Sequence, residues 1–427
     1  MTSGRQLSPY RRGAEAERQR RSAILEAATE HFSEKGFVGT TTEEIALSAG
    51  ITKRTLYRYM GTKTGILYGI HQRFFLASGI LDGTFDHSGS TATERLSAFI
   101  KRHVQIVVDH RDEISVFFDE FKHLDSAQKA SILRQRRDYE NLAQSIMLQG
   151  VESGEFDLYD PGLAARCLLG AMNEMSRWLE PDGQLGGEDI AQVIATIFID
   201  GLALGSHPPL ETLPKVAIPQ PNHMSIMDNI VHESTRLFNE KGYPATRTRE
   251  IARATNLSSG SLYYHAKSKE FILSEIHHRM MRDGLDLVGR AAQSGQSWPN
   301  TMHAMVYAHL NVAQRHRNPM TIFLESKRYL SPDALAQAVT ERDAYVKLFE
   351  TVIQNASRDG TFRDFDSRVI SLIIIGSLNS TYRWFREDGK LSTNRFSNVF
   401  AQLILFGLRG TSSSRHSRRT QLLTGSD

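Results

Sequence analysis

The chain has a single cysteine, Cys167, and lacks any run of about 18 apolar residues in its 427 positions. One cysteine excludes a disulfide framework and any metal site built from several cysteines, as is typical of proteins in a reducing compartment. No apolar segment follows the basic amino terminus, so a secretory signal peptide is not expected. We therefore expect a cytoplasmic protein with no membrane partner. The net charge of +3 is too small to require an anionic partner, so the placement of the charges matters more.

Signatures of common enzyme classes are also missing. The sequence has no phosphate-binding glycine loop, no His-Glu-x-x-His pair and no nucleophile elbow. Its 16 histidines are scattered, and the adjacent His277 and His278 would lie on different faces of a helix, which does not suit a metal site. We therefore expect no catalytic residue, no metal and no cofactor, and we predict that the chain is not an enzyme.

What the sequence does contain is the same pattern twice. Residues 24–67 align with residues 230–273 without a gap, at an offset of 206, and 16 of the 44 positions are identical. Chance would give roughly a tenth of the positions or fewer. The register persists downstream, where the segment 173–178 recurs as 379–384 with its asparagine, arginine and tryptophan retained. The repeated unit is therefore a whole protein of about 200 residues.

Each copy opens with a helix-turn-helix pattern. In the first copy, apolar residues at helical spacing from Ile24 onward predict a helix that ends at Gly36. Thr41 and Glu44 have the spacing of a capping box at the start of a second helix. Thr52 is placed to cap a third helix. In the second copy an arginine replaces the capping threonine of the box, but a serine, at position 258, still caps the third helix.

A helix-turn-helix reads DNA because its second helix enters the major groove while neighbouring groups grip phosphates. Cationic and hydroxyl side chains are the groups that such an interface needs. In the first copy the candidate DNA contacts are Thr41, Thr42, Thr52, Lys53, Arg54, Thr55, Tyr57, Arg58, Tyr59 and Lys63. In the second copy they are Thr246, Ser258, Ser259, Gly260, Ser261, Tyr263, Tyr264, His265 and Lys269. A solvated basic helix is the alternative interpretation, and two aligned copies favour DNA binding over it.

Both windows resemble the DNA-binding domain of the TetR family of bacterial repressors. The matching elements are Phe-x-x-Lys-Gly at the end of helix one, Thr-x-x-x-Glu-Ile-Ala in helix two, and the capped helix that carries Leu-Tyr. Met60 and Ala266 depart from the usual aromatic residue after the reading helix. The resemblance implies an all-α fold of two TetR-like units, each with a helix-turn-helix domain and a helical ligand-binding and dimerisation domain. Because the family acts as homodimers, it also implies an intrachain pseudo-dimer, with further self-association left open.

Composition divides the chain further. A stretch with five prolines is the natural linker between the copies, and a tail rich in serine and arginine is expected to be disordered. The arginines near the amino terminus indicate either an arm for the minor groove or phosphates, or a solvated tail. The expected segments are a basic arm (1–20), helix-turn-helix domain one (21–68), regulatory domain one (69–205), the linker (206–223), helix-turn-helix domain two (224–274), regulatory domain two (275–410) and the tail (411–427).

The regulatory halves carry a second repeated feature, in which asparagine, arginine and tryptophan lie on otherwise apolar helices. A buried arginine needs an anionic partner. One interpretation is an arginine that meets a carboxylate at the interface between the halves, with tryptophan packing beside it. The other follows from resemblance to the family's regulators of fatty-acid and steroid catabolism, in which arginine would meet coenzyme A phosphates. The candidate ligand-binding residues are Asn173, Arg177, Trp178, Asn379, Arg383 and Trp384.

These features together predict a ligand-responsive regulator of transcription. We expect a repressor that binds a double-stranded DNA operator and is released by a small-molecule effector, for which an acyl-CoA thioester is the candidate inducer. The reading segment 52–63 has four lysines or arginines, whereas segment 258–269 has only Lys267 and Lys269. The alternative is therefore a helical adaptor that has lost sequence-specific DNA binding in one or both heads.

Overall fold

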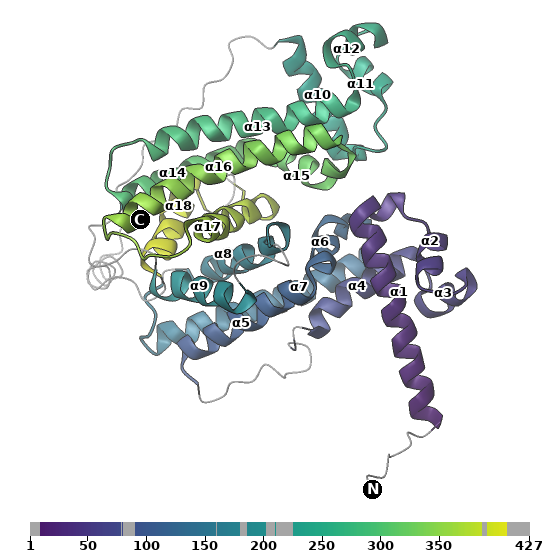
Figure 1. Ribbon diagram of the computed structural model, residues 1–427, viewed down its shortest axis with the longest axis horizontal. Coiled ribbons are helices and arrows are strands. Elements are labelled where there is room, and N and C mark those ends of the chain that lie inside the picture. Colours follow the sequence, from purple (N-terminus) through teal and green to yellow (C-terminus); the bar gives the residue numbers. More distant parts are fainter. Residues whose placement is uncertain are drawn as a thin grey trace. The chain divides into compact units, whose positions relative to one another are not determined.

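The regular elements in the described part of the chain are helices, which confirms the all-α expectation (Figure 1). The computed structural model describes residues 9–77, 79, 90–158, 160–179, 186–201, 210, 225–386 and 391–407. The expected tail and all but one residue of the expected linker lie outside these ranges. Within them, no helix is long and apolar enough to cross a membrane. By its internal contacts the chain divides into two compact units, Met1–Ser88 with Gln105–Asn141, and Gly89–Val104 with Leu142–Asp427.

The first copy runs from α1 to α9. Its elements are α1 (Pro9–Gly39), α2 (Thr42–Ser48), α3 (Lys53–Met60), α4 (Lys63–Ala77), α5 (Ala92–Asp109), α6 (Arg111–Asp119), η1 (Phe121–His123), α7 (Ser126–Glu152), α8 (Pro161–Glu174), η2 (Met175–Arg177) and α9 (Gly187–Asp200). Helix α1 is broken at Gly36, which adopts φ 73° and ψ 166°, so the predicted break is confirmed. Because α1 begins at Pro9, most of the expected arm is helical, and its Glu17 and Arg21 pair one turn apart (Nε to Oε1, 3.3 Å).

The second copy repeats this series of helices. Its elements are α10 (Ile226–Lys241), α11 (Thr248–Ala254), α12 (Ser259–Ala266), α13 (Lys269–Ala292), α14 (Trp298–Arg315), α15 (Arg317–Ser326), η3 (Lys327–Tyr329), α16 (Pro332–Arg358), α17 (Ser367–Ser380), η4 (Thr381–Arg383) and α18 (Thr393–Phe406). Most of these helices begin and end 206 residues after their counterparts. The duplication seen in the sequence is therefore a duplication of structure.

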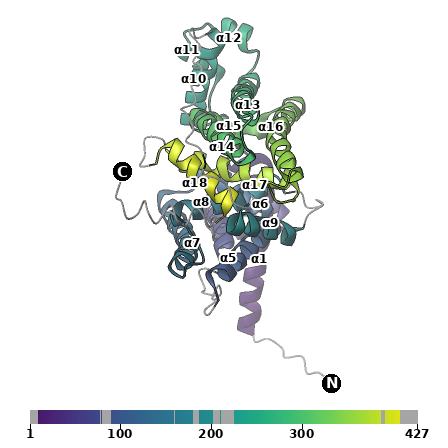
Figure 2. The same cartoon turned by 90° about the vertical axis from the view of Figure 1, so that its left-hand side faces the viewer.

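The last two helices of each copy pack together inside the second unit. Helix α8 lies beside α17, and α9 contacts α18 (Figure 2). A Cβ added to Gly170 would lie 2.2 Å from the Ser380 hydroxyl oxygen, and one added to the equivalent Gly376 would lie 3.1 Å from the Glu174 Cβ. Equivalent glycines thus let the two helices approach closely at equivalent points. Such reciprocity is the mark of an interface related by twofold symmetry.

The ends of α9 and α18 show the same reciprocity. Gly201 and Gly407 both have positive φ, 82° and 64°, which glycine adopts without strain. A Cβ on Gly201 would lie 2.4 Å from the Leu405 carbonyl oxygen, and one on Gly407 would lie 2.4 Å from that of Ile199. The two chain segments therefore meet backbone to backbone, an arrangement that residues with side chains would prevent.

Candidate functional site

The first helix-turn-helix domain is held by the caps that the sequence predicts. The Thr41 amide donates to Glu44 Oε2 (2.7 Å), and the Glu44 amide donates to Thr41 Oγ1 (3.2 Å), which completes the capping box. The Thr55 amide donates to Thr52 Oγ1 (3.2 Å) at the start of α3. Leu56 of α3 is completely buried, so its neighbours at other helical angles face outward. These local bonds fix the direction of the reading helix.

The second domain keeps the same geometry with different residues. The Arg247 amide still donates to Glu250 Oε2 (2.8 Å), so half of the capping box survives without the threonine. The Ser261 amide donates to Ser258 Oγ (3.0 Å) at the start of α12. In the turn before the reading helix, Asn256 has φ 58°. Asparagine is among the few residues other than glycine that tolerate a positive φ. Both copies therefore fold as a helix-turn-helix.

The exposed face of α3 carries concentrated positive charge. Lys53, Arg54 and Arg58 are all exposed, and Lys53 is paired with a glutamate of α2. Arg58 Nη2 and Arg20 Nη1 each donate to the Tyr59 hydroxyl (both 3.0 Å). The Arg20 guanidinium, followed by that of Arg58, lowers the pKa of Tyr59. Helix α1 thus adds a cation beside the reading helix, and this neighbour cannot be seen by aligning the two copies.

The exposed face of α12 is hydroxylic and aromatic instead. Tyr264 is 83% exposed and Tyr263 is 52% exposed, which is unusual for residues of this size. Ser258, Ser259 and Gly260 are also exposed. Such a surface can donate and accept hydrogen bonds and can stack, but it offers phosphates little charge. The difference in residue type between the heads therefore extends to the surfaces that they present.

Two of the predicted DNA contacts, Lys63 and Lys269, have partners within the protein. Lys63 Nζ donates to the Thr40 carbonyl oxygen (2.5 Å). Lys269 Nζ donates to the carbonyl oxygens of Tyr243 (2.9 Å) and Thr246 (3.0 Å). Burial lowers the pKa of both lysines. Each lysine therefore ties the start of its helix to the turn before α2 or α11.

Two of the predicted DNA contacts, Thr42 and Thr246, have buried side chains. Thr246 is 1% exposed, and its hydroxyl donates to the carbonyl oxygens of Leu237 (3.3 Å) and Gly242 (2.9 Å). Thr42 is 8% exposed, with its hydroxyl 3.3 Å from that of Tyr57. Sequence spacing places these residues near the start of the second helix. It does not show that the Thr246 hydroxyl turns inward to two backbone carbonyls, or that the Thr42 hydroxyl is taken up by Glu43 and Tyr57.

A buried carboxylate joins the arginines of the two repeated motifs. Glu174 Oε2 lies 3.1 Å from Arg177 Nε, and Glu174 Oε1 lies 3.0 Å from Arg383 Nη1. The Glu174 side chain is 5% exposed, and its equivalent in the second copy is Ser380. One carboxylate therefore serves both arginines, and the symmetry of the repeat is broken here. This is the interface contact that the first interpretation predicted for these arginines.

A cavity of about 230 Å³ lies next to this cluster, within the regulatory domain of the second copy. Its walls come from α13 to α17, and the first copy closes it with Glu174, Arg177 and Trp178. The lining is mainly apolar. Its apolar side chains from the second copy include Met280, Met281, Met320, Phe323, Leu324, Leu335, Val339, Leu372 and Ile375. Lys327 and Arg342 are exposed residues of the lining, so cations lie at its edge.

The structure divides the six predicted ligand residues into two groups. Arg177, Trp178 and Asn379 line the cavity. The others have roles in packing: Asn173 is hydrogen-bonded to His103, Arg383 pairs with Glu174, and Trp384 packs on Phe396 with ring centroids 5.5 Å apart. The nitrogen of the Trp178 indole is buried without a hydrogen-bond partner. An occupant with an acceptor atom would satisfy it.

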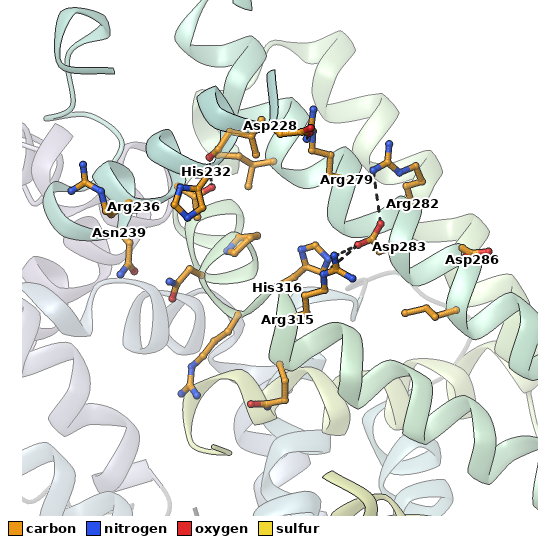
Figure 3. Close-up of a pocket in the computed structure, with 18 of the residues that line it drawn as sticks. Asp228, His232, Arg236, Asn239, Arg279, Arg282, Asp283, Asp286, Arg315 and His316 are labelled. Atoms are coloured by element: carbon orange, nitrogen blue, oxygen red, sulfur yellow. Dashed lines mark hydrogen bonds and ion pairs between the residues drawn. The ribbon is translucent and has the colours of Figure 1, made fainter. Parts of the chain in front are cut away.

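A second, polar cleft of about 1030 Å³ lies between α10 and helices α13 to α15 (Figure 3). Arg236 comes from α10, whereas Arg279 and Asp283 come from α13. Asp283 Oδ2 lies 2.9 Å from His316 Nε2. His316 also lines the apolar cavity, so the cavity and the cleft share a wall. Helix α13 therefore borders the cavity on one side and the second head on the other.

Sequence reasoning missed Glu174 and the methionine-lined wall. A signal for Glu174 was present, because it is the only acidic residue between Pro161 and Leu179, a stretch that is otherwise mostly apolar. The methionines gave no signal, since methionine at helical spacing is typical of any core. Among the described residues, no cluster of three or more potential ligands could hold a metal ion.

Comparison with known proteins agrees with this architecture. The model of the tetR family of bacterial regulatory proteins matches residues 24–68 and 230–276, and that of the tetracyclin repressor-like C-terminal domain matches residues 89–202 and 295–408. The chain is 26% identical over 195 residues to the HTH-type transcriptional repressor KstR2 of Mycolicibacterium smegmatis, and the match covers 44% of this chain and 93% of that protein.

Solved structures match a similar share of the chain. The TetR-family regulator PfmR from Thermus thermophilus is 28% identical, with a TM-score of 0.39, and the match covers 41% of this chain and 95% of PfmR. AibR, solved with isovaleryl coenzyme A and operator DNA, is 22% identical, with a TM-score of 0.39, and the match covers 44% of this chain and all of AibR. Since both family models match twice and together span more than half of its residues, the chain belongs to the TetR family, with the family's two domains present in tandem.

Proposed function

We propose that the chain is a ligand-responsive transcriptional repressor that works as a covalent pseudo-dimer with two unequal heads. The observation that carries this proposal is the presence of two intact helix-turn-helix domains whose reading helices expose different residues at equivalent positions. The packing of α8 and α9 on α17 and α18 supports the pseudo-dimer, since the family's dimer interface uses these helices. Repression is supported by the similarity to KstR2.

Unequal heads favour an asymmetric operator. Arg54 and Arg58 of the first head suit guanine acceptors, and Arg20 adds a positive charge beside them that can meet DNA phosphates. The exposed serines and tyrosines of the second head suit weaker and less charge-dependent contacts. The first head would therefore supply most of the affinity, and the second head would define the spacing and the second half-site.

The effector acts through α13 in this proposal. Helix α12 ends at Ala266 and α13 begins at Lys269, so a displacement of α13 is passed to the reading helix across two residues. Helix α13 also lines the cavity through Met280, Met281 and Gly284. A ligand that fits the cavity better when α13 has moved would favour the DNA-released state, in proportion to its difference in affinity for the two states.

An acyl-CoA thioester is the effector class that we propose. Its apolar acyl group would occupy the cavity, and Arg177, Lys327 and Arg342 would meet its anionic part. A volume of about 230 Å³ is below the usual range of roughly 300 to 1,000 Å³ for ligand pockets, which favours a short acyl group. Arg383 does not line the cavity and serves the interface instead.

The test is DNA binding by the purified chain to its own upstream region, measured by fluorescence anisotropy. Short-chain acyl-CoA should release the DNA, whereas free coenzyme A and the free acid should do so only at much higher concentration. Arg342→Ala should weaken the effect of acyl-CoA by about tenfold or more, because a charge-assisted hydrogen bond contributes roughly 1.5 to 3 kcal/mol. Arg358→Ala, on the same helix and exposed outside the cavity, is the matched control.

Two results would contradict the proposal in different ways. If the folded chain binds no fragment of its upstream region, it is an adaptor and not a repressor. If it binds DNA but no acyl-CoA changes that binding, the chain remains a DNA-binding regulator and the effector class is wrong.

A further inference from the structure

The positions that line the cavity in the second half can be compared directly with those 206 residues earlier. Met280 and Met281 correspond to Phe74 and Phe75. Further along, Leu324 and Lys327 correspond to phenylalanines, and the small Ala313 and Ala338 correspond to a valine and an isoleucine that are completely buried. At each of these positions the first half has a bulkier apolar or aromatic side chain, except that Phe121 replaces the charged Lys327.

The aromatic side chains of the first half pack on one another. The Phe117 ring centroid lies 5.0 Å from that of Phe74, 5.6 Å from that of Phe75 and 5.0 Å from that of Phe118. Phe74 and Phe75 are themselves 5.2 Å apart in an edge-to-face arrangement, which is favourable for aromatic pairs. Both are almost completely buried. The rings therefore occupy space that methionine and leucine leave open in the second half.

An arginine at equivalent positions has a different environment in each half. The Arg136 guanidinium carbon lies 4.3 Å from the ring centroid of Phe117, 5.1 Å from that of Phe118 and 4.5 Å from that of Phe121. Its equivalent, Arg342, is exposed and lines the cavity, with a neighbouring aspartate carboxylate 3.3 Å from its Nη2. The first half thus uses its arginine for cation–π packing, whereas the second half presents it to an occupant.

We infer that the chain has one effector site and not two. This site lies in the second half and is closed by Arg177 and Trp178 of the first half, while the equivalent side chains of α4, α6 and η1 in the first half are aromatic residues that pack on one another. The occupant is an apolar group joined to an anionic end, because cations lie at the edge of an apolar cavity. The inference rests on the proposed function for the role of the cavity. It adds that the signal is asymmetric, with the ligand acting on the second head.

The experiment counts binding sites on the full chain with 8-anilinonaphthalene-1-sulfonate, an apolar fluorophore with one anionic group. Calorimetry and fluorescence titration should give one site per chain. Met281→Phe combined with Leu324→Phe transfers the first-half residues into the cavity and should weaken binding by at least tenfold. The smaller change Ala313→Val should weaken it too, and provides a second test if the double variant does not fold. Phe118→Leu, the reverse change in the first half, is the matched control and should keep one site.

Two sites per chain, no binding to the folded wild-type chain, or unchanged binding by the folded filling variants would each overturn the inference. The count involves no DNA, so it is separate from the test of the proposed function. One probe site in a chain that binds no operator would refute the repressor and leave the single site standing. Two probe sites in a chain that acyl-CoA releases from DNA would refute the single site and leave the repressor standing.

Discussion

Replacing Glu174 by glutamine should destabilise the second unit more than replacing either arginine that it binds. Glutamine has nearly the same shape, so the close approach of the Glu174 Cβ to Gly376 is retained. The change removes the negative charge that faces Arg177 and Arg383, whose side chains are only 15% and 22% exposed. Two guanidinium groups then lose this charged partner in one step.

The magnitude follows from the two ion pairs that share this carboxylate. Removing one partner of a buried ion pair costs about 3 to 5 kcal/mol. Both arginines keep some contact with water, and glutamine can still accept one hydrogen bond, so we expect about 2 to 4 kcal/mol for Glu174→Gln. Arg383→Gln leaves Glu174 paired with Arg177 and should cost only about 1 to 2 kcal/mol.

Intrinsic fluorescence measures this difference cleanly. The three tryptophans of the chain, Trp178, Trp298 and Trp384, all belong to the second unit, so urea unfolding followed by tryptophan emission reports that unit alone. Circular dichroism at 222 nm follows the whole chain for comparison. A glutamine variant at position 174 that is no less stable than the Arg383→Gln variant would refute the shared carboxylate as the central contact of this interface.

Three further predictions concern the heads and the buried histidines. Arg54→Ala or Arg58→Ala should each cost about 1 to 3 kcal/mol of operator binding, and selection from random DNA should return two dissimilar half-sites; a perfect inverted repeat would contradict the unequal heads. Lys267→Gly should stabilise the second head by about 1 kcal/mol in thermal unfolding, because Lys267 has φ 42° where the first copy has glycine, and no gain would mean that the turn is unstrained. Burial lowers the pKa of His71 and of His309 to about 4, so between pH 6.5 and 4 these histidines bind protons in the unfolded chain but not in the folded chain. The melting temperature should therefore fall as the pH drops from about 6.5 towards 4, and a flat profile would exclude neutral buried histidines.

The ends of the helices and the duplication could be predicted from the sequence because both depend on near neighbours or on residue identity. A capping bond such as that from the Thr55 amide to Thr52 joins residues three apart, so the residue types alone predict it. The break at Gly36 is equally local, and the offset of 206 is a property of the sequence itself. For the same reason the positions of the reading helices, and of most of their exposed residues, follow from the order of residue types.

Other features were decided by contacts between residues far apart in the chain. The pair of Arg177 with Glu174 is local, because the two residues lie three positions apart. Arg383 reaches the same carboxylate only because α8 packs against α17, and no spacing rule connects residues about 200 positions apart. The inward turn of Thr246 depends on the backbone carbonyls of Leu237 and Gly242, which the fold places beside its hydroxyl. Whether a row of apolar residues fills its space or leaves a cavity depends on side-chain volumes summed over several helices, which only the tertiary structure brings together.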